Sequence, residues 1–432
     1  MDKNRIHLFR RRRETDKRYR RYVRCLTVIL LSVVMLCAGC TVKDAEGSSA
    51  GGSGEQTAAA DSRQNEAGSS TEAAPKTETA ATASRSWNNM SPVSSMDLLY
   101  ADQFSVDYYE NDISLITIED TDQFLLLPEG MSAPVGLPDS IKILQKPVKN
   151  IYLVATSAMD DFIHLDAMDL IALSGTKDTG WYLPEAKTAM EEGKIAYAGK
   201  YSAPDYEKIL SSDCGLAVES TMIYHTPEVK EQLERLGIPV LVERSSYEGH
   251  PLGRMEWIRL YGVLTGKEAE AEQIFRENID ALSDVLDMEP SGKTAAFFYV
   301  TNSGSVNVRK NGDYIAKMIA LAGGTYIPGN AGSDENALST MNMDFESFYA
   351  AAKDADVLIY NSTIDGELTA IDELCAKNQL FADFKAVKEG NVWCTGKNMF
   401  QETMGLGDMI RDMNAVFADD TEYSFTYLHQ LK

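Results

Sequence analysis

Four cationic side chains stand out in a chain whose carboxylates far outnumber its basic groups. The sequence holds 65 Asp and Glu against 41 Lys and Arg, and its formal charge is −24. Three loops that follow strand-like segments carry Arg244 and Arg254, Arg309, and Lys397. Open α/β sheets bind ligands beyond the carboxyl ends of their strands, and an arginine fork suits carboxylate or catecholate oxygens. We therefore expect contacts to an anionic ligand, although ordinary ion pairs with nearby carboxylates would explain each side chain equally simply. Arg309 is preferred because Gly304 and its polar loop offer few apolar neighbours.

Aromatic and imidazole groups in the same regions are further candidates for ligand contact. These are Tyr224, His225, Tyr247 and Tyr299. Haem needs an axial ligand, and Met222, Tyr224 or His225 could supply one. A lone loop histidine, however, is more often hydrated or hydrogen bonded. The four histidines beyond His7 lack the spacing of a metal site. We predict no metal site and no resident cofactor.

Motifs of catalysis are missing from the sequence. It contains no GxSxG elbow, no HExxH, no Walker A loop and no GxGxxG after a strand. Ser220 and His225 lie too close in sequence to form a triad by themselves. We therefore expect a protein that is not an enzyme, with a surface enzyme as the rival class.

Cys40 is a candidate for lipid attachment. A basic stretch that ends at Arg24 precedes an uncharged stretch over residues 25–39, as in a secretory signal peptide. The residues before Cys40 resemble a bacterial lipobox, except that Cys37 stands where leucine is usual. We predict a lipoprotein signal peptide at residues 1–39 and acylation of Cys40, with an uncleaved signal anchor as the alternative. Either way, the remaining chain works outside the cytoplasm and is held to a membrane.

The composition after Cys40 predicts a tether. Residues 40–90 are mostly Ser, Gly, Ala, Thr and Glu, and such a segment buries too little apolar surface to fold. Coil scaling gives it an average reach of roughly 35–40 Å. The acidity of the rest of the chain argues against nucleic acid as a partner.

The body of the chain predicts an α/β protein. Strand-like and helical segments alternate through residues 91–254 and again through residues 290–432, which indicates two Rossmann-like lobes. Residues 255–289 carry helical periodicity over a length of roughly 40 Å, although Gly266 also allows two consecutive helices. Cys375 and Cys394 could form one disulfide, but we favour free thiols, including Cys214.

Several segments, in this order, resemble the substrate-binding lipoproteins of ABC importers of the helical-backbone class. They are PDYEKIL at 204–210, LGIPV at 236–240, LYGVLTGKEAEAE at 260–272, LAGG at 321–324 and FKAVKEGNVW at 384–393. The resemblance implies the two-lobe fold of class III periplasmic binding proteins, a ligand held between the lobes, and a monomer.

The same resemblance implies partners and ligands. The class delivers iron–siderophore complexes, haem or cobalamin to ABC permease and ATPase subunits, and we place an iron(III) siderophore complex first. By motif position, Glu207 and Glu346 correspond to the glutamates that dock on the permease. A simpler reading is that each carboxylate is favoured by the dipole of its helix. A sensor or adhesive lipoprotein without a permease is a third alternative.

Overall fold

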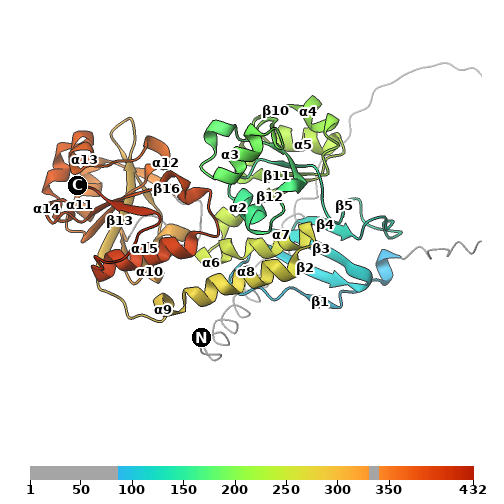
Figure 1. Cartoon of the computed structure of the whole chain (residues 1–432), viewed down its shortest axis with the longest axis horizontal. Coiled ribbons are helices and arrows are strands. Elements are labelled where there is room, and N and C mark those ends of the chain that lie inside the picture. The colour runs from blue at the N-terminus through green and yellow to red at the C-terminus, as the bar shows by residue number, and fades with distance from the viewer. Residues whose placement is uncertain (1–85, 330–339) are drawn as a thin grey trace, which may run out of the picture. The chain divides into compact units, whose positions relative to one another are not determined.

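The computed structural model describes residues 86–329 and 340–432. The expected signal peptide at residues 1–39, Cys40 and most of the expected tether lie outside the described residues. Figure 1 colours the described chain from blue at its first strands to red at its last helix.

The first sheet is mainly antiparallel and precedes the α/β lobes. Its strands follow one another in space as β1 (Ser94–Ser95), β2 (Phe104–Tyr109), β3 (Ile113–Ile118), β4 (Asp122–Leu127) and β5 (Ile141–Gln145), with only β4 and β5 parallel. Asn111–Asp112 and Glu119–Asp120 turn the chain with positive φ angles, which suit tight hairpins. Such short connections cannot span a parallel crossover. These strands, which lie within the range 91–254 expected to form the first lobe, therefore make a sheet of their own outside the parallel sheet of that lobe.

The first α/β lobe has a fully parallel sheet in the order β12–β11–β6–β7–β8. Its strands are β6 (Ile151–Leu153), β7 (Ile171–Ser174), β8 (Ala196–Tyr197), β11 (Leu216–Ser220) and β12 (Val240–Glu243). The connecting helices include α2 (Ala158–His164), α3 (Pro184–Glu191), α4 (Tyr206–Ser211) and α5 (Pro227–Arg235). The chain winds outward from β6 in both directions, which is the Rossmann-like arrangement that the alternation predicts.

The connection between the lobes is helical but divided. It comprises α6 (Pro251–Met255), α7 (Trp257–Thr265), α8 (Glu268–Ala281) and α9 (Ser283–Leu286). Gly266 ends α7 with φ 74°, a left-handed cap that lets the chain turn back. α8 then packs on α7 so closely that a Cβ on Gly262 would lie 2.5 Å from Cβ of Ala271. Of the two arrangements that the sequence allows, the structure shows the one divided at Gly266, and α7, α8 and α9 replace a single helix over residues 255–289.

The second α/β lobe has a mixed sheet in the order β16–β14–β13–β17–β18–β19, with β15 also paired to β13. Its strands are β13 (Thr294–Val300), β14 (Val306–Arg309), β15 (Thr325–Ile327), β16 (Thr340–Met343), β17 (Val357–Tyr360), β18 (Val392–Thr395) and β19 (Leu428–Gln430). Its helices are α10 (Tyr314–Leu321), α11 (Phe345–Ala352), α12 (Ser362–Asp365), α13 (Ile371–Lys377), α14 (Lys385–Lys388) and α15 (Leu406–Ala418). The fold class of two α/β lobes joined through helices is thus confirmed, and Cys214, Cys375 and Cys394 are free thiols.

Two buried carboxylates attach the first sheet to the helices between the lobes. The successive backbone N–H groups of residues 99–103 donate to the side chains of Glu256 and Glu248 over 2.7–3.1 Å. Arg259 forms an ion pair of 2.7 Å with Glu256, and the indole of Trp257 donates to Glu248. Buried charges persist when they are paired and hydrogen bonded in this way. Burial raises the pKa of Glu248 to about 8, so the charged pair here is Glu256 with Arg259. The segment that leads into β2 is held by hydrogen bonds to both side chains.

Glu219 on β11 lacks such partners. Both of its carboxylate oxygens are buried without a hydrogen bond, and burial raises its pKa to about 8. Because its folded pKa lies above the ordinary value of 4.5, the native state binds more protons than the unfolded chain between these pH values. Its contribution to stability is therefore complete below pH 4.5 and is lost as the pH rises toward 8.

We expect Glu219→Gln to flatten the dependence of stability on pH. Within the window from pH 4.5 to 8, the unfolding free energy of the original protein should fall relative to the variant by about 1.4 kcal/mol per pH unit. Urea unfolding of both proteins at pH 5, 6, 7 and 8 measures this difference. Glu228→Gln, at an exposed position on α5, is the control and should not flatten the curve. Parallel curves for the original protein and Glu219→Gln would contradict the prediction.

Candidate functional site

Loops from the two lobes meet beyond the carboxyl ends of the first-lobe strands. Ser157 accepts a hydrogen bond of 2.9 Å from Thr403 through its carbonyl oxygen, and Asp160 accepts one of 2.8 Å from the backbone of Met404. The side chain of Gln401 accepts from the Tyr182 backbone over 2.8 Å. These contacts join α2, the residue before it and the loop after β7 to the segment between β18 and α15. The candidate ligand region is bounded by loops that touch one another.

Arg244, which follows β12, is almost fully buried and makes several contacts. Its guanidinium forms a bidentate ion pair with Glu119, in which Nη2–Oε1 and Nη1–Oε2 are each 2.9 Å apart. It also donates to the side-chain oxygen of Gln103 over 3.1 and 3.2 Å and to the Tyr224 hydroxyl over 2.9 Å. The ring of Tyr247 lies 4.4 Å from the guanidinium carbon, a cation–π distance. The structure thus brings three of the predicted residues together, namely Arg244, Tyr224 and Tyr247.

Arg254, on α6, reaches the second lobe. Its guanidinium carbon lies 4.1 Å from the ring centre of Tyr314 on α10, and its Nε is buried without a hydrogen-bond partner. Burial, Asp160 and Glu243 raise the pKa of Asp161 well above its ordinary value, whereas the charge of Arg254 lowers it. Arg254 therefore lies at the contact of the lobes, close to a group of buried carboxyl groups.

Arg309, at the end of β14, has a different environment from the one that we expected. Its guanidinium lies over the rings of Phe297 and Phe400, at 5.7 and 5.4 Å, and its ion pair with Asp313 is 3.6 Å long. The expectation of few apolar neighbours was wrong, because pairing of β13 with β14 brings Phe297 to this side chain and the turn Lys397–Phe400 brings Phe400. Arg309 and Arg254 both lower the pKa of Tyr314, which burial raises, so both charges act on the same ring.

The remaining predicted contacts lie apart from these two groups of residues. Lys397 begins the 3-10 turn Lys397–Phe400 and is partly exposed. His225 is exposed at the end of the turn Thr221–His225. Tyr299 is partly buried and packs against the aromatic core of the second lobe. None of the contacts described around Arg244 or Arg254 involves these three side chains.

Glu207 and Glu346 occupy equivalent positions in the two lobes. Each is the second residue of its helix, α4 or α11, and each is exposed. The preceding N-cap residues are Asp205, which accepts from the Lys208 backbone over 3.1 Å, and Asp344, which accepts from Ser347 over 2.8 Å. Because the caps satisfy the first turns, neither glutamate is needed as the cap of its helix.

Sequence reasoning missed Glu119, Gln103 and Tyr314, which contact the predicted arginines. The first two come from the separate antiparallel sheet, more than 100 residues from Arg244 in the chain. A carboxylate or amide in a polar hairpin carries no local signal of such a distant partner. Tyr314 begins α10 directly after its cap Asp313, and its aromatic character is equally typical of a core position.

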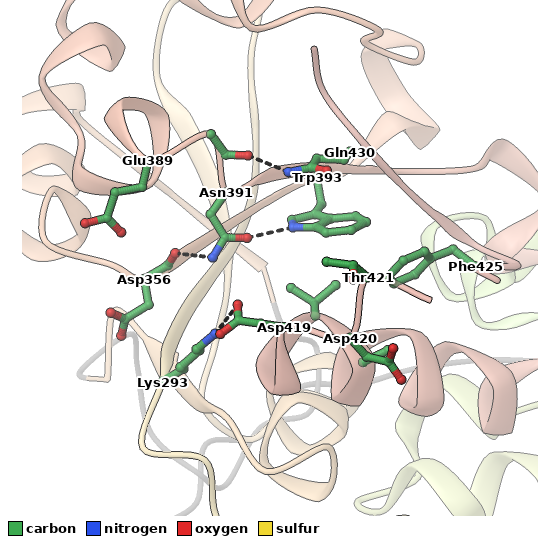
Figure 2. A pocket seen from close by; sticks show the side chains of 13 residues that line it. Lys293, Asp356, Glu389, Asn391, Trp393, Asp419, Asp420, Thr421, Phe425 and Gln430 are labelled. Atoms are coloured by element: carbon green, nitrogen blue, oxygen red, sulfur yellow. Dashed lines mark hydrogen bonds and ion pairs between the residues drawn. The ribbon is translucent and has the colours of Figure 1, made fainter. Parts of the chain in front are cut away.

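A cavity of about 520 Å³ lies elsewhere, in the second lobe. It is at the amino ends of β13, β17 and β18, opposite to the loops described above. Figure 2 shows Asn391 bonded to both Asp356 and the Trp393 indole, and Lys293 facing Asp419. In residues 86–329 and 340–432, no group of His, Cys, Asp and Glu side chains could hold a metal ion. Among the helices of these residues, none combines the length and apolar character needed to cross a bilayer.

Solved structures of other proteins share this fold at low sequence identity. A periplasmic heme-binding protein of Pseudomonas aeruginosa is 15% identical, with a TM-score of 0.50 over 66% of this chain and 98% of its own. A periplasmic binding protein of Veillonella parvula is 16% identical, with a TM-score of 0.50 over 63% of this chain and 92% of its own. At this identity, the likeness shows the fold alone.

Sequence comparison leads to the same class. An uncharacterized lipoprotein of Methanocaldococcus jannaschii is 26% identical in an alignment of 334 residues that covers 70% of this chain and 77% of the relative. The family described as periplasmic binding protein matches residues 155–399, more than half of the chain. The resemblance to substrate-binding proteins of the helical-backbone class is confirmed, and the chain belongs to the periplasmic binding protein family.

Proposed function

We propose that this protein is an extracytoplasmic substrate-binding lipoprotein of an ABC importer that captures an iron(III) complex of the siderophore type. The observation that carries the proposal is the placement of cationic side chains in a chain of net charge −24. Arg254 from α6 and Arg309 from the second lobe both act on Tyr314, and the buried Arg244 lies next to the rings of Tyr224 and Tyr247, at 5.8 and 4.4 Å. An anionic complex whose oxygens surround a metal ion fits such a set of charges.

Delivery requires a second set of contacts, on the outside of the lobes. Glu207 and Glu346 are exposed, lie at matching positions and are free of a capping role, which suits contact with arginines of a permease. The partners are then the permease and ATPase subunits of an importer, and the binding protein acts as a monomer. Acylation of Cys40 keeps it near the membrane, where a high effective concentration compensates for weak docking.

Haem is the second candidate ligand. The neighbour from Pseudomonas aeruginosa is a heme-binding protein, and the exposed side chains of Tyr224 and His225 include potential axial ligands. Cobalamin remains a further member of the ligand class. A surface enzyme or a sensor lipoprotein is the alternative from another functional class, and neighbouring genes for an importer would separate transport from both.

We expect a ferric siderophore complex to quench tryptophan fluorescence at lower concentration than haem, cobalamin or iron-free siderophore. Arg309→Gln should weaken binding of an anionic ferric complex about 10-fold, because it removes a charge-assisted contact. Arg276→Gln, on the exposed face of α8, is the matched control and should bind like the original protein. Tighter binding of haem or cobalamin would overturn the ligand assignment, and unchanged affinity of Arg309→Gln would remove Arg309 from the site.

Replacement of both Glu207 and Glu346 by alanine should lower uptake while ligand affinity stays the same. Each substitution removes one exposed carboxylate that would otherwise meet the permease, and neither residue lies among the ligand contacts. Uptake of labelled ligand by cells and affinity of the purified protein are measured side by side. Glu185→Ala with Glu228→Ala, at exposed first-turn positions of α3 and α5, is the control pair. Undiminished uptake would exclude the docking role.

A further inference from the structure

The contact between Glu119 and Arg244 joins a surface hairpin to a buried cation. Glu119 turns the chain between β3 and β4 with φ 52°, and its side chain is 51% exposed. The side chain of Arg244 is only 8% exposed. If the Glu119 carboxylate leaves this contact, water can solvate it, whereas water cannot solvate the buried guanidinium of Arg244. The charge of Arg244 therefore needs an anionic partner at all times.

Other contacts hold the guanidinium in place independently of Glu119. Gln103 accepts from both Nε and Nη2 of Arg244, and its own amide donates to Asp102 over 2.7 Å. The backbone of Gln103 is held in turn by buried Glu248. With Tyr247 against one face and the Tyr224 hydroxyl at Nη1, the arginine stays oriented when Glu119 moves away.

We propose that Arg244, Tyr224 and Tyr247 form an anion-binding site whose resident occupant is the carboxylate of Glu119, which an incoming ligand oxyanion must displace. Glu119 thereby sets the charge selectivity of ligand capture. A neutral group gains nothing at the site, because it would leave the buried guanidinium without its counter-charge. An aromatic anion should bind most tightly, because it replaces the bidentate ion pair and also contacts the tyrosine rings. This inference deepens the proposed function and rests on it for the placement of Arg244 among ligand contacts.

The site can be tested with small probes that do not depend on iron. Benzoate and benzamide have nearly the same shape and differ in charge. The whole protein is labelled with ¹⁵N-arginine, and the Nε–Hε signal of Arg244 is followed as each probe is added. Glu119→Gln keeps the size of the side chain and removes its charge, so the fraction of molecules that accept an anion should rise.

We expect Glu119→Gln to bind benzoate about 10-fold more tightly than the original protein, since an ion pair at a half-exposed position no longer competes. Benzamide should bind neither protein measurably, because a neutral probe supplies no counter-charge for the buried guanidinium. Glu119→Asp keeps the charge on a shorter side chain and should gain less than Glu119→Gln. The matched control is Glu110→Gln, at an exposed position in the neighbouring hairpin, which should behave like the original protein.

The proposal is overturned if Glu119→Gln gains no affinity for benzoate, if benzamide gains equally, or if Glu110→Gln shows the same gain. A ferric tricatecholate complex is titrated into the same set of proteins to separate this inference from the proposed function. Failure of the ferric complex to bind any of them, with the benzoate result as expected, would reject iron-complex capture and leave the anion site. Binding of the ferric complex without a gain for benzoate would reject the role of Glu119.

Discussion

The arrangement of the described chain depends on two buried carboxylates that bind the backbone of one short segment. Glu256 and Glu248 lie beside the start of α7, and they accept hydrogen bonds from the successive N–H groups of residues 99–103. Backbone groups buried without partners would be costly, as would two unpaired carboxylates, so each set of groups satisfies the other. Removal of either carboxylate would leave several donors unsatisfied at once. This contact fixes the antiparallel sheet against the helices between the lobes.

That attachment places the sheet where it can influence the candidate site. The segment of residues 99–103 leads directly into β2, and Gln103 at its end orients Arg244. The hairpin between β3 and β4 supplies Glu119 to the same guanidinium. A sheet outside the two α/β lobes therefore contributes to a site formed by loops of the first lobe. One hydrophobic core runs through the antiparallel sheet, the helices α6 to α8 and α10 and α15 of the second lobe. This shared core favours small movements of one lobe against the other.

Local sequence patterns predicted the α/β lobes well. The parallel strands of the first lobe are continuous apolar segments such as 151–154 and 216–218, and the helices between them carry their own start and stop signals, such as Pro227 and Gly237. The sequence did not predict that the first strands form a separate antiparallel sheet, because an alternating strand such as β3 does not specify its neighbour. The environments of Arg244 and Arg309 were unpredictable for a related reason. Their partners Glu119 and Phe400 are ordinary residues until the fold brings them close.

The division at Gly266 has a mechanical consequence for the two lobes. Every residue of α7 is buried, and α8 packs back along it, so the two helices do not form a continuous rod between the lobes. A single rod would carry a twist from one lobe to the other along its whole length. Here the non-helical residues 287–293 link α9 to β13, the first strand of the second lobe. Rotation of the second lobe would then occur at this linker, with α10 and α15 sliding over α6. Ligand capture would change the side-chain packing between these helices and would not bend a helix.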